Sequence, residues 1–410
     1  KGLPVESSTF PSAALNQEVT LIARLNTPLI NFKTFEAARR SSGLNVYLHH
    51  SDANPMGMAA TLMPTRAERR ETDLLSLQGV FSGYLTPVVL GELKGGVSVL
   101  DQRKIARSPL PAGNIVIGST LADGSTGWTS VGIGGGASSS HARVTTWEVQ
   151  GEIKRFAPGS AKHLLKLNLD LRLDEEWRTT ELDGAGTFAF SSLTDFLADR
   201  PATFTRTLNN RARSGQEWNG FVSLGDWFQV SPDLKLLYGL RTEANHFVQH
   251  PAYNAMIDRA FGARTDETPN RIYVSPRIGF TWSYRSASAG SILTSSGLGR
   301  FVTPPVGVIR GGIGEFRAMM SPSLMSEVGA QSGLPGGLKI IACVGEAVPA
   351  PEWNSYLTAP SRIPADCIEG ASPGMRDAAP SVQLVDTRYD APRSWRGNLA
   401  WTTSVPYAIL

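Results

Sequence analysis

A strict alternation of leucine with polar residues is the clearest pattern along the chain, at residues 163–173. The apolar positions are Leu165, Leu167, Leu169, Leu171 and Leu173, and the polar positions are Lys166, Asn168, Asp170 and Arg172. Successive side chains of a strand point to opposite faces, so this segment predicts one apolar and one polar face. A strand of this length, tilted by about 45°, crosses a slab of roughly 25 Å. Soluble strands have only about 5–6 residues, so the pattern favours a membrane barrel.

The same alternation returns elsewhere in the chain. It is seen at residues 147–154, 234–241, 277–284 and 395–402. Residues 75–84 and 90–100 predict a hairpin around Leu85-Thr86-Pro87, and Ser231-Pro232-Asp233 predicts a tight turn. The predicted fold class is therefore all-β, a transmembrane antiparallel β-barrel.

Long and short connections are expected to lie at opposite ends of this barrel. The long ones are residues 108–141, 247–271 and 321–380, whereas the connections at Pro87 and Pro232 are short. This asymmetry is typical of outer-membrane barrels, whose long loops are extracellular. Aromatic residues near strand ends favour an interfacial girdle over ordinary core packing; they are Trp147, Trp177, Trp218, Trp282, Tyr284 and Trp395. Helical periodicity is confined to residues 32–40 and 319–330.

Composition narrows the function classes. Charged residues make up 18% of the 410 residues, and hydrophobic residues reach 41%, which is enough to bury a large apolar surface. No run of 18 uncharged apolar residues exists, so the sequence excludes a transmembrane helix. A net charge of +3 without a basic run gives no indication of a nucleic-acid partner.

The two cysteines, Cys343 and Cys367, both fall within residues 321–380. Two thiols fit one disulfide of an exported protein better than a zinc site, which requires four ligands; two free thiols are the alternative. We expect a disulfide that closes a proline-rich extracellular loop. Trp353 and Tyr356 lie between the cysteines, where they either contact a ligand or pack this loop onto its neighbours.

Motifs of catalysis and cofactor binding are missing. The sequence contains no Walker A, HExxH, GxSxG or CxxC pattern. The glycine-rich residues 132–136 and 311–314 lack the following helix that a phosphate cradle requires, so we expect a loop and a barrel strand there. The histidine pairs are His49 with His50 and His246 with His250, and no carboxylate or cysteine at ligand spacing accompanies them. We therefore expect no enzymatic activity, no cofactor and no metal.

Several segments carry a family resemblance. They are FAFSSLTDF at 188–196 with Pro201 and Phe204, Asp226-Trp227, SPDL at 231–234, YGLR at 238–241 with Glu243, SPRIGF at 275–280, RGGIGEF at 310–316, PRSWR at 392–396 and LGELK at 90–94. In this order and spacing they resemble the barrel of TonB-dependent receptors, most closely the Oar-like subgroup. The resemblance covers about residues 70 to 405.

The resemblance implies a barrel of about 22 strands around a plug domain, in the outer membrane of a Gram-negative bacterium. It also implies import of a large or scarce substrate, an iron chelate, an oligosaccharide or a peptide, with energy from the TonB complex. The sequence offers only about twelve to fourteen strands and no plug or TonB-contacting motif. We therefore expect residues 1–410 to form part of the barrel. The rest of the protein or a partner chain would supply the missing strands, and a plug outside this sequence would contact TonB.

Two further function classes remain open. A non-transporting structural or adhesion component of the outer membrane would keep the barrel without the plug. A soluble β-sandwich that binds glycans is the third candidate, but strand length and aromatic strand ends count against it.

Overall fold

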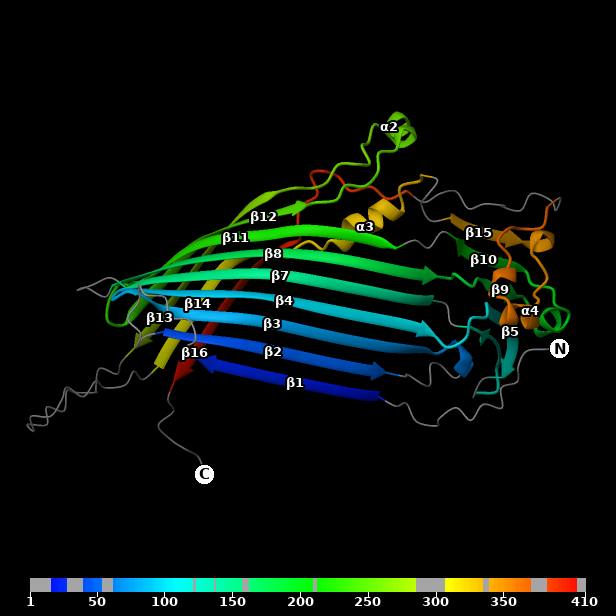
Figure 1. Ribbon diagram of the computed structural model, residues 1–410, viewed down its shortest axis with the longest axis horizontal. Coiled ribbons are helices and arrows are strands. Elements are labelled where there is room, and N and C mark those ends of the chain that lie inside the picture. Colours follow the sequence, from blue (N-terminus) through cyan, green and yellow to red (C-terminus); the bar gives the residue numbers. More distant parts are fainter. Residues whose placement is uncertain are drawn as a thin grey trace, which may run out of the picture.

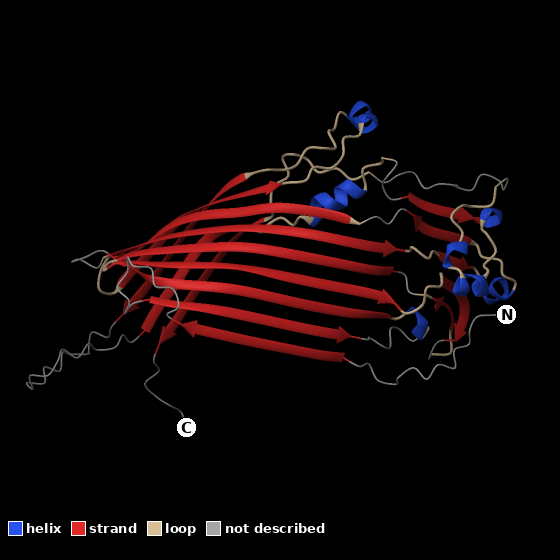
Figure 2. Cartoon of the chain, viewed as in Figure 1, coloured by secondary structure: helices blue, strands red, loops and turns tan. Residues whose placement is uncertain are grey.

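The computed structural model describes residues 16–27, 40–53, 62–120, 123–135, 138–156, 162–208, 212–284, 307–334, 339–369 and 382–403. Strands dominate this part of the chain, as Figures 1 and 2 show, and they form one sheet of 11 strands and one of five. The predicted all-β fold class is thereby confirmed. No α-helix within these ranges has the length and apolar character needed to cross a membrane.

The large sheet is antiparallel throughout and follows the chain order. Its strands, in spatial order, are β1 (Asn16–Thr27), β2 (Arg40–Ala53), β3 (Glu68–Thr86), β4 (Val89–Ala106), β7 (Ser138–Phe156), β8 (His163–Leu182), β11 (Arg213–Gln229), β12 (Leu234–Phe247), β13 (Ile272–Tyr284), β14 (Gly307–Arg317) and β16 (Arg393–Thr403). The sheet curls, so that β14 and β16 pass behind the front strands, such as β3, in Figure 1. Several strands have 17 to 20 residues, which is far beyond the usual soluble length.

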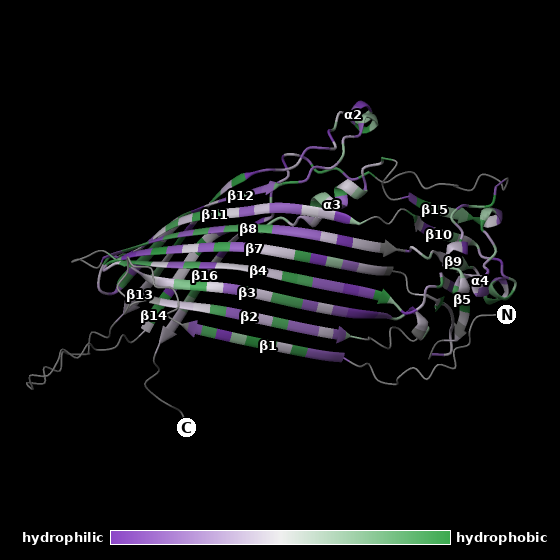
Figure 3. Ribbon diagram, in the orientation of Figure 1, coloured by the Kyte–Doolittle hydropathy of each residue, from purple (hydrophilic) through white to green (hydrophobic). Residues whose placement is uncertain are grey.

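The leucine row of β8 sets the register of the sheet. Leu167 lies opposite Leu224 of β11 and Ile153 of β7, and Leu169 lies opposite Val222. Directly opposite residues of an antiparallel pair share a face, so one face of the sheet is apolar across these strands. Figure 3 shows the bands of hydropathy that result. Leu169 remains 49% exposed, as expected for a side chain on a lipid-facing surface.

The small sheet is built from the long connections of the large one. Its strands, in spatial order, are β15 (Lys339–Val344), β10 (Thr203–Leu208), β9 (Thr187–Phe190), β5 (Ala112–Thr120) and β6 (Thr126–Gly134). We call this sheet, with α1 (Leu193–Leu197), α4 (Trp353–Thr358) and the turns between them, the lobe. It extends beyond the strand ends of the barrel in Figure 1, at the end where the long connections lie.

The core of the lobe is the largest buried apolar cluster in the described residues. Its buried members include Ile115 of the connection after β4, Phe188 and Phe204 of the connection after β8, and Ile341 of the connection after β14. Each of these side chains alternates with an exposed or half-buried neighbour along its strand, as period-2 burial requires. The core therefore fixes the three connections to one another.

Two other helices stand outside the lobe. α2 (Ala255–Phe261) lies at the tip of the connection between β12 and β13, and the side chain of Asn254 caps it by accepting from the backbone N–H groups of Met256 and Ile257. α3 (Ser323–Ala330) follows β14 and packs against β11 inside the curl of the sheet, so the predicted helix at 319–330 is present but shorter.

The short connections match the sequence analysis, and one glycine segment does not. Val230 donates its N–H to the carbonyl of Leu234 at 3.0 Å, which closes the predicted turn between β11 and β12. Residues 132–134 end strand β6 and pair with β5, although we expected a loop there. Arg66 and Leu62 pack directly on Gly132, since an added Cβ would lie 2.5 Å from Nη1 of Arg66 and from Cδ2 of Leu62. The helix expected at 32–40 lies outside the described residues.

The two faces of β8 predict opposite responses to the same substitution. Leu169→Arg places a charge on the apolar face, which costs about 2–4 kcal/mol near the midplane of a bilayer. Asn168→Arg places the charge on the polar face, where Asn168 now donates to Ser223 at 2.9 Å. We expect Leu169→Arg to lower the folded fraction in outer membranes and Asn168→Arg to leave it near wild type. Heat-modifiable gel mobility measures this fraction, and equal tolerance of both changes would contradict a lipid-facing leucine row.

Candidate functional site

The polar face of the large sheet carries ion pairs both between strands and along single strands. Glu152 of β7 binds Lys166 of β8 at 2.5 Å and also pairs with Lys154. Further along β8, Arg172 binds Asp174 at 2.7 Å. Charges that are paired in this way tolerate half-burial, whereas isolated charges do not. This face is therefore suited to a water-filled or protein-filled interior rather than to lipid.

A segment of the connection after β14 folds back onto this polar face. We call residues 318–332 the inner segment; it contains α3. Ala318 donates its N–H to the carbonyl of Pro392 at 3.0 Å. This hydrogen bond holds the start of the segment beside the first residue of β16. Gly215 of β11 permits the close approach of the segment, because an added Cβ would lie 2.4 Å from the carbonyl oxygen of Pro322. A side chain at position 215 would displace it.

A small apolar cluster fixes the inner segment to the wall. Met320, Met325 and Val328 are 9%, 4% and 3% exposed, and they pack against Phe247 and Tyr273 at the ends of β12 and β13. Burying these side chains stabilises the contact by roughly 1.5–3 kcal/mol each before conformational entropy is counted. The inner segment is therefore part of the wall and narrows the interior at this level.

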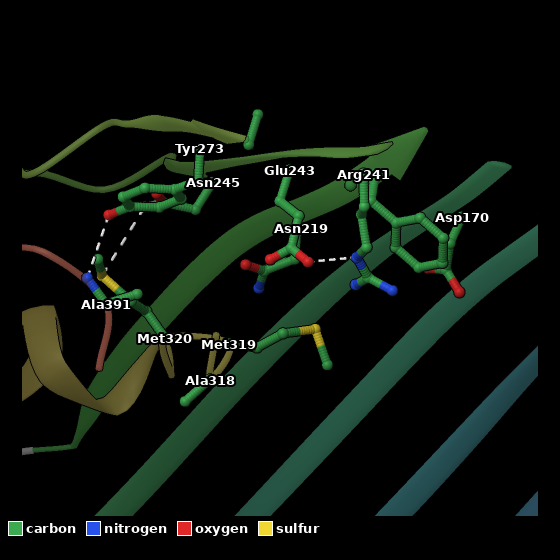
Figure 4. Close-up of a pocket in the computed structure, with 13 residues that line it drawn as sticks. Asp170, Asn219, Arg241, Glu243, Asn245, Tyr273, Ala318, Met319, Met320 and Ala391 are labelled. Atoms are coloured by element: carbon green, nitrogen blue, oxygen red, sulfur yellow. Dashed lines mark hydrogen bonds and ion pairs between the residues drawn. The ribbon is translucent and has the colours of Figure 1, made fainter. Parts of the chain in front are cut away.

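A pocket opens beneath the inner segment, and Figure 4 shows it. Arg241 of β12 forms an ion pair with Glu243 two residues along the same strand, and its guanidinium lies 3.4 Å from the ring centroid of Phe221. Asp170, Asn219 and Asn245 complete the polar lining, and the inner segment contributes Ala318, Met319 and Met320. The cavity holds about 30 Å³, which is the size of a single water or a hydroxyl group.

The pocket offers both donors and acceptors to a polar solute. The Arg241 guanidinium donates, the carboxylates of Asp170 and Glu243 accept, and the amides do both. Asp170 and Arg241 occupy polar positions of the alternating segments at 163–173 and 234–241, so the sequence predicted their face. The sequence did not predict which residues lie opposite one another on neighbouring strands, nor that the inner segment folds back over them. Both are needed to bring these side chains into one pocket.

Cys343 and Cys367 are joined by a disulfide, with the two Cα atoms 5.5 Å apart. Cys343 lies on β15 opposite Phe204 of β10, so the bond ties the turns after α4 to the core of the lobe. Trp353 and Tyr356 are 6% and 2% exposed and belong to the same core. Their burial fits the packing alternative better than contact with a ligand.

Asp183 connects the end of β8 to the lobe. Its carboxylate accepts from the hydroxyls of Thr187 at 2.6 Å and Thr205 at 3.0 Å, and burial raises the pKa of this carboxyl above its usual value. Arg206 donates to the carbonyl of Ile363 at 2.6 Å, which binds the connection after β14 to the connection after β8. These polar contacts, like the core, join parts of the chain that are distant in sequence.

The described residues contain no cluster of side chains suited to bind a metal ion. No group of three or more His, Cys, Asp or Glu side chains there is arranged to hold an ion. His49 and His50 point to opposite faces of β2, because adjacent strand residues do so; His50 binds Asp73 at 2.6 Å.

The long strands, the apolar outer face and the ion-paired inner face define an antiparallel barrel of the bacterial outer membrane. The chain belongs to the outer membrane beta barrel domain family, whose model matches residues 50–408. The protein is therefore located in the outer membrane of a Gram-negative bacterium.

A solved structure and the curated proteins give little further detail. The outer membrane transporter YddB from Escherichia coli is similar with a TM-score of 0.43 and 11% sequence identity, over 74% of this chain. The match covers 32% of that transporter, so this chain spans about a third of its length. No curated protein matches the sequence.

We expect the stability of the lobe to depend on the disulfide between Cys343 and Cys367. It joins two residues with a sequence separation of 24, and by the chain-entropy model a closed loop of this size contributes about 3 kcal/mol. We expect the double variant Cys343→Ser/Cys367→Ser to expose the lobe to protease at lower temperature, while the barrel strands stay protected. Peptide mapping after limited proteolysis measures this difference. Two freely alkylated thiols in wild-type protein taken from native membranes would contradict the bond.

Proposed function

We propose that this chain forms part of the barrel of a TonB-dependent transporter, which takes up a large or scarce substrate. The observation that carries the proposal is the inner wall, where ion pairs, a polar pocket and a folded-in segment face the interior. A barrel that served only as an anchor would not need such an elaborated inner surface. The Oar-like segments support the same assignment, and the substrate classes that this resemblance offers are iron chelates, oligosaccharides and peptides.

The proposal requires further strands and a plug. Strands β1 and β16 are the two edges of the large sheet, and neither edge is paired within the described ranges. An unpaired backbone group in lipid costs several kcal/mol, so both edges need partners. We assign these partners to the remainder of the same protein or to a second chain. A plug inside the closed barrel would contact the TonB complex and bear on the inner wall.

We also propose an orientation, in which the lobe and the connection at 321–380 face the outside of the cell. The support is the asymmetry of the connections, since long loops of outer-membrane barrels are extracellular and short turns are periplasmic. Within 321–380, the inner segment turns into the barrel, whereas β15 and α4 join the lobe.

Single-cysteine variants test this orientation. Met256 of α2 is 77% exposed, and Pro232 is exposed in the short turn at the opposite end. We expect a membrane-impermeant maleimide to label Met256→Cys on intact cells and Pro232→Cys only after the outer membrane is opened. The native cysteines are joined and provide an unreactive background. Labelling of Pro232→Cys alone on intact cells would reverse the orientation.

Uptake measurements test the transport function. A strain that lacks the gene should lose uptake of one substrate class, and loss of the TonB complex should have the same effect. We expect Arg241→Gln in the full-length protein to reduce this uptake about tenfold if one charged hydrogen bond to the substrate is lost. Leu240→Ala is the matched control, because Leu240 is the neighbouring residue on the lipid face and is 51% exposed.

The alternative is a barrel that displays the lobe as a structural or adhesion component. One observation favours it: Trp128 at the lobe surface is 80% exposed, and Val344 is 50% exposed. Large exposed apolar side chains often mark contact surfaces. Normal uptake of all three substrate classes in the strain without the gene, together with reduced attachment to surfaces, would select this alternative.

A further inference from the structure

The outer face of the sheet changes from apolar to charged between two neighbouring rows of residues. The charged row, read across β2, β3, β4 and β7, consists of His50, Asp73, Asp101 and Arg143, and Val19 of β1 lies next to His50 at its end. The next row toward the short turns consists of Leu21, Leu48, Leu75, Val99 and Thr145. Both rows are on the same face as the apolar band, because they differ by two positions on every strand. The border between the rows therefore marks where the hydrocarbon core of the membrane ends.

A cavity of about 480 Å³ lies on this border. The apolar row forms one side through Leu21, Leu48 and Leu75, and the charged row forms the other. Its volume falls within the roughly 300–1,000 Å³ that is usual for ligand sites. The cavity is apolar on the side of the short turns and charged on the side of the long connections. It therefore fits a molecule with an acyl chain and a polar head.

The charges at the rim are not evenly compensated. His50 binds Asp73 at 2.6 Å, and Asp101 binds His141 at 2.9 Å and Arg103 at 3.0 Å. Both carboxylates are therefore occupied by neighbours. Arg143 also lines the cavity, its side chain is exposed, and no ion pair joins it to a carboxylate within the described part of the chain.

Tryptophan accompanies this guanidinium. Trp177 of β8 lies directly opposite Arg143, and its ring packs edge-on against His141, with 5.0 Å between the ring centroids. Tryptophan at a membrane boundary positions its ring at the level of the lipid head groups. Arg143 is therefore at head-group depth, beside a cavity that continues into the apolar band.

We propose that this cavity binds one phosphorylated lipid of the outer leaflet, with an acyl chain along the apolar row and its phosphate on Arg143. A guanidinium forms two parallel hydrogen bonds with a phosphate, which suits an anionic head group better than an uncharged one. The assignment to the outer leaflet rests on the orientation proposed above, whereas the preference for a phosphorylated lipid does not depend on it.

The same strand offers a matched control. Arg155 is exposed on the same face of β7, at the opposite border of the apolar band, and no ion pair joins it to a carboxylate in the described residues. It does not line the cavity. Arg143→Gln and Arg155→Gln therefore remove the same charge from equivalent depths of the two membrane borders, and only the first removes it from the proposed site.

Native mass spectrometry of the full-length protein, purified in detergent and titrated with diphosphoryl lipid A, tests the proposal. We expect wild type and Arg155→Gln to retain one lipid equally and Arg143→Gln to bind about tenfold more weakly, the loss of one charged contact. Val99→Trp, which fills the cavity, should abolish retention while heat-modifiable mobility shows a folded barrel. The same lipid without phosphates should bind wild type no better than it binds Arg143→Gln.

Three outcomes would overturn the proposal. Equal weakening by Arg143→Gln and Arg155→Gln would indicate general attraction of anionic lipid. Equal affinity of wild type for the lipid with and without phosphates would remove the role of Arg143. Unchanged binding to folded Val99→Trp would place the lipid outside the cavity. A reversed maleimide pattern would withdraw the outer leaflet alone, so failure of the orientation and failure of the site are distinguishable.

Discussion

Hydrogen bonding of the backbone in a medium without water is the constraint on which this structure depends. Lipid offers no partner to a peptide N–H or carbonyl, so the strands that cross it must satisfy one another. The long registered pairs from β1 to β16 meet that demand for every strand between the two edges. Once pairing fixes the register, side chains are free to differ completely on the two faces. The leucine row of β8 and the charged residues that alternate with it are the direct result.

The inner face uses the freedom that pairing creates. Polar side chains there bind each other across strands, as Glu152 and Lys166 do, and a segment from outside the barrel is accommodated where Gly215 leaves room. The inner segment brings apolar side chains with it, and Phe247 and Tyr273 receive them at the ends of β12 and β13. The interior is consequently a mixture of an ion-paired wall and a small hydrophobic contact, and the pocket beneath Met319 lies where the two meet.

Local pattern predicted what depends on neighbours in sequence, and it missed what depends on register. The faces of β8, the turn at residues 231–234 and the helix near 323–330 follow from spacing and turn chemistry. Residues 132–136 were expected to form a loop, but residues 132–134 pair with β5 as the end of β6, and Arg66 and Leu62 pack on Gly132. Glycine has little strand propensity, so this pairing could not be read from the segment alone. The pocket around Arg241 and the cavity beside Arg143 each require residues from several strands. No single segment of the sequence contains that information.

The lobe has a consequence for biogenesis. Its pairs β5 with β9 and β10 with β15 join connections that are separated by whole barrel strands, and contacts of such high sequence separation form late. Since the strands that carry the three connections must lie in their final order for these connections to meet, we expect the lobe to close after those strands have paired. A closed lobe core would then indicate that the strands from β4 to β14 are correctly ordered. Chains that stall earlier would leave Phe188 and Phe204 uncovered, a state that periplasmic chaperones and proteases are equipped to detect.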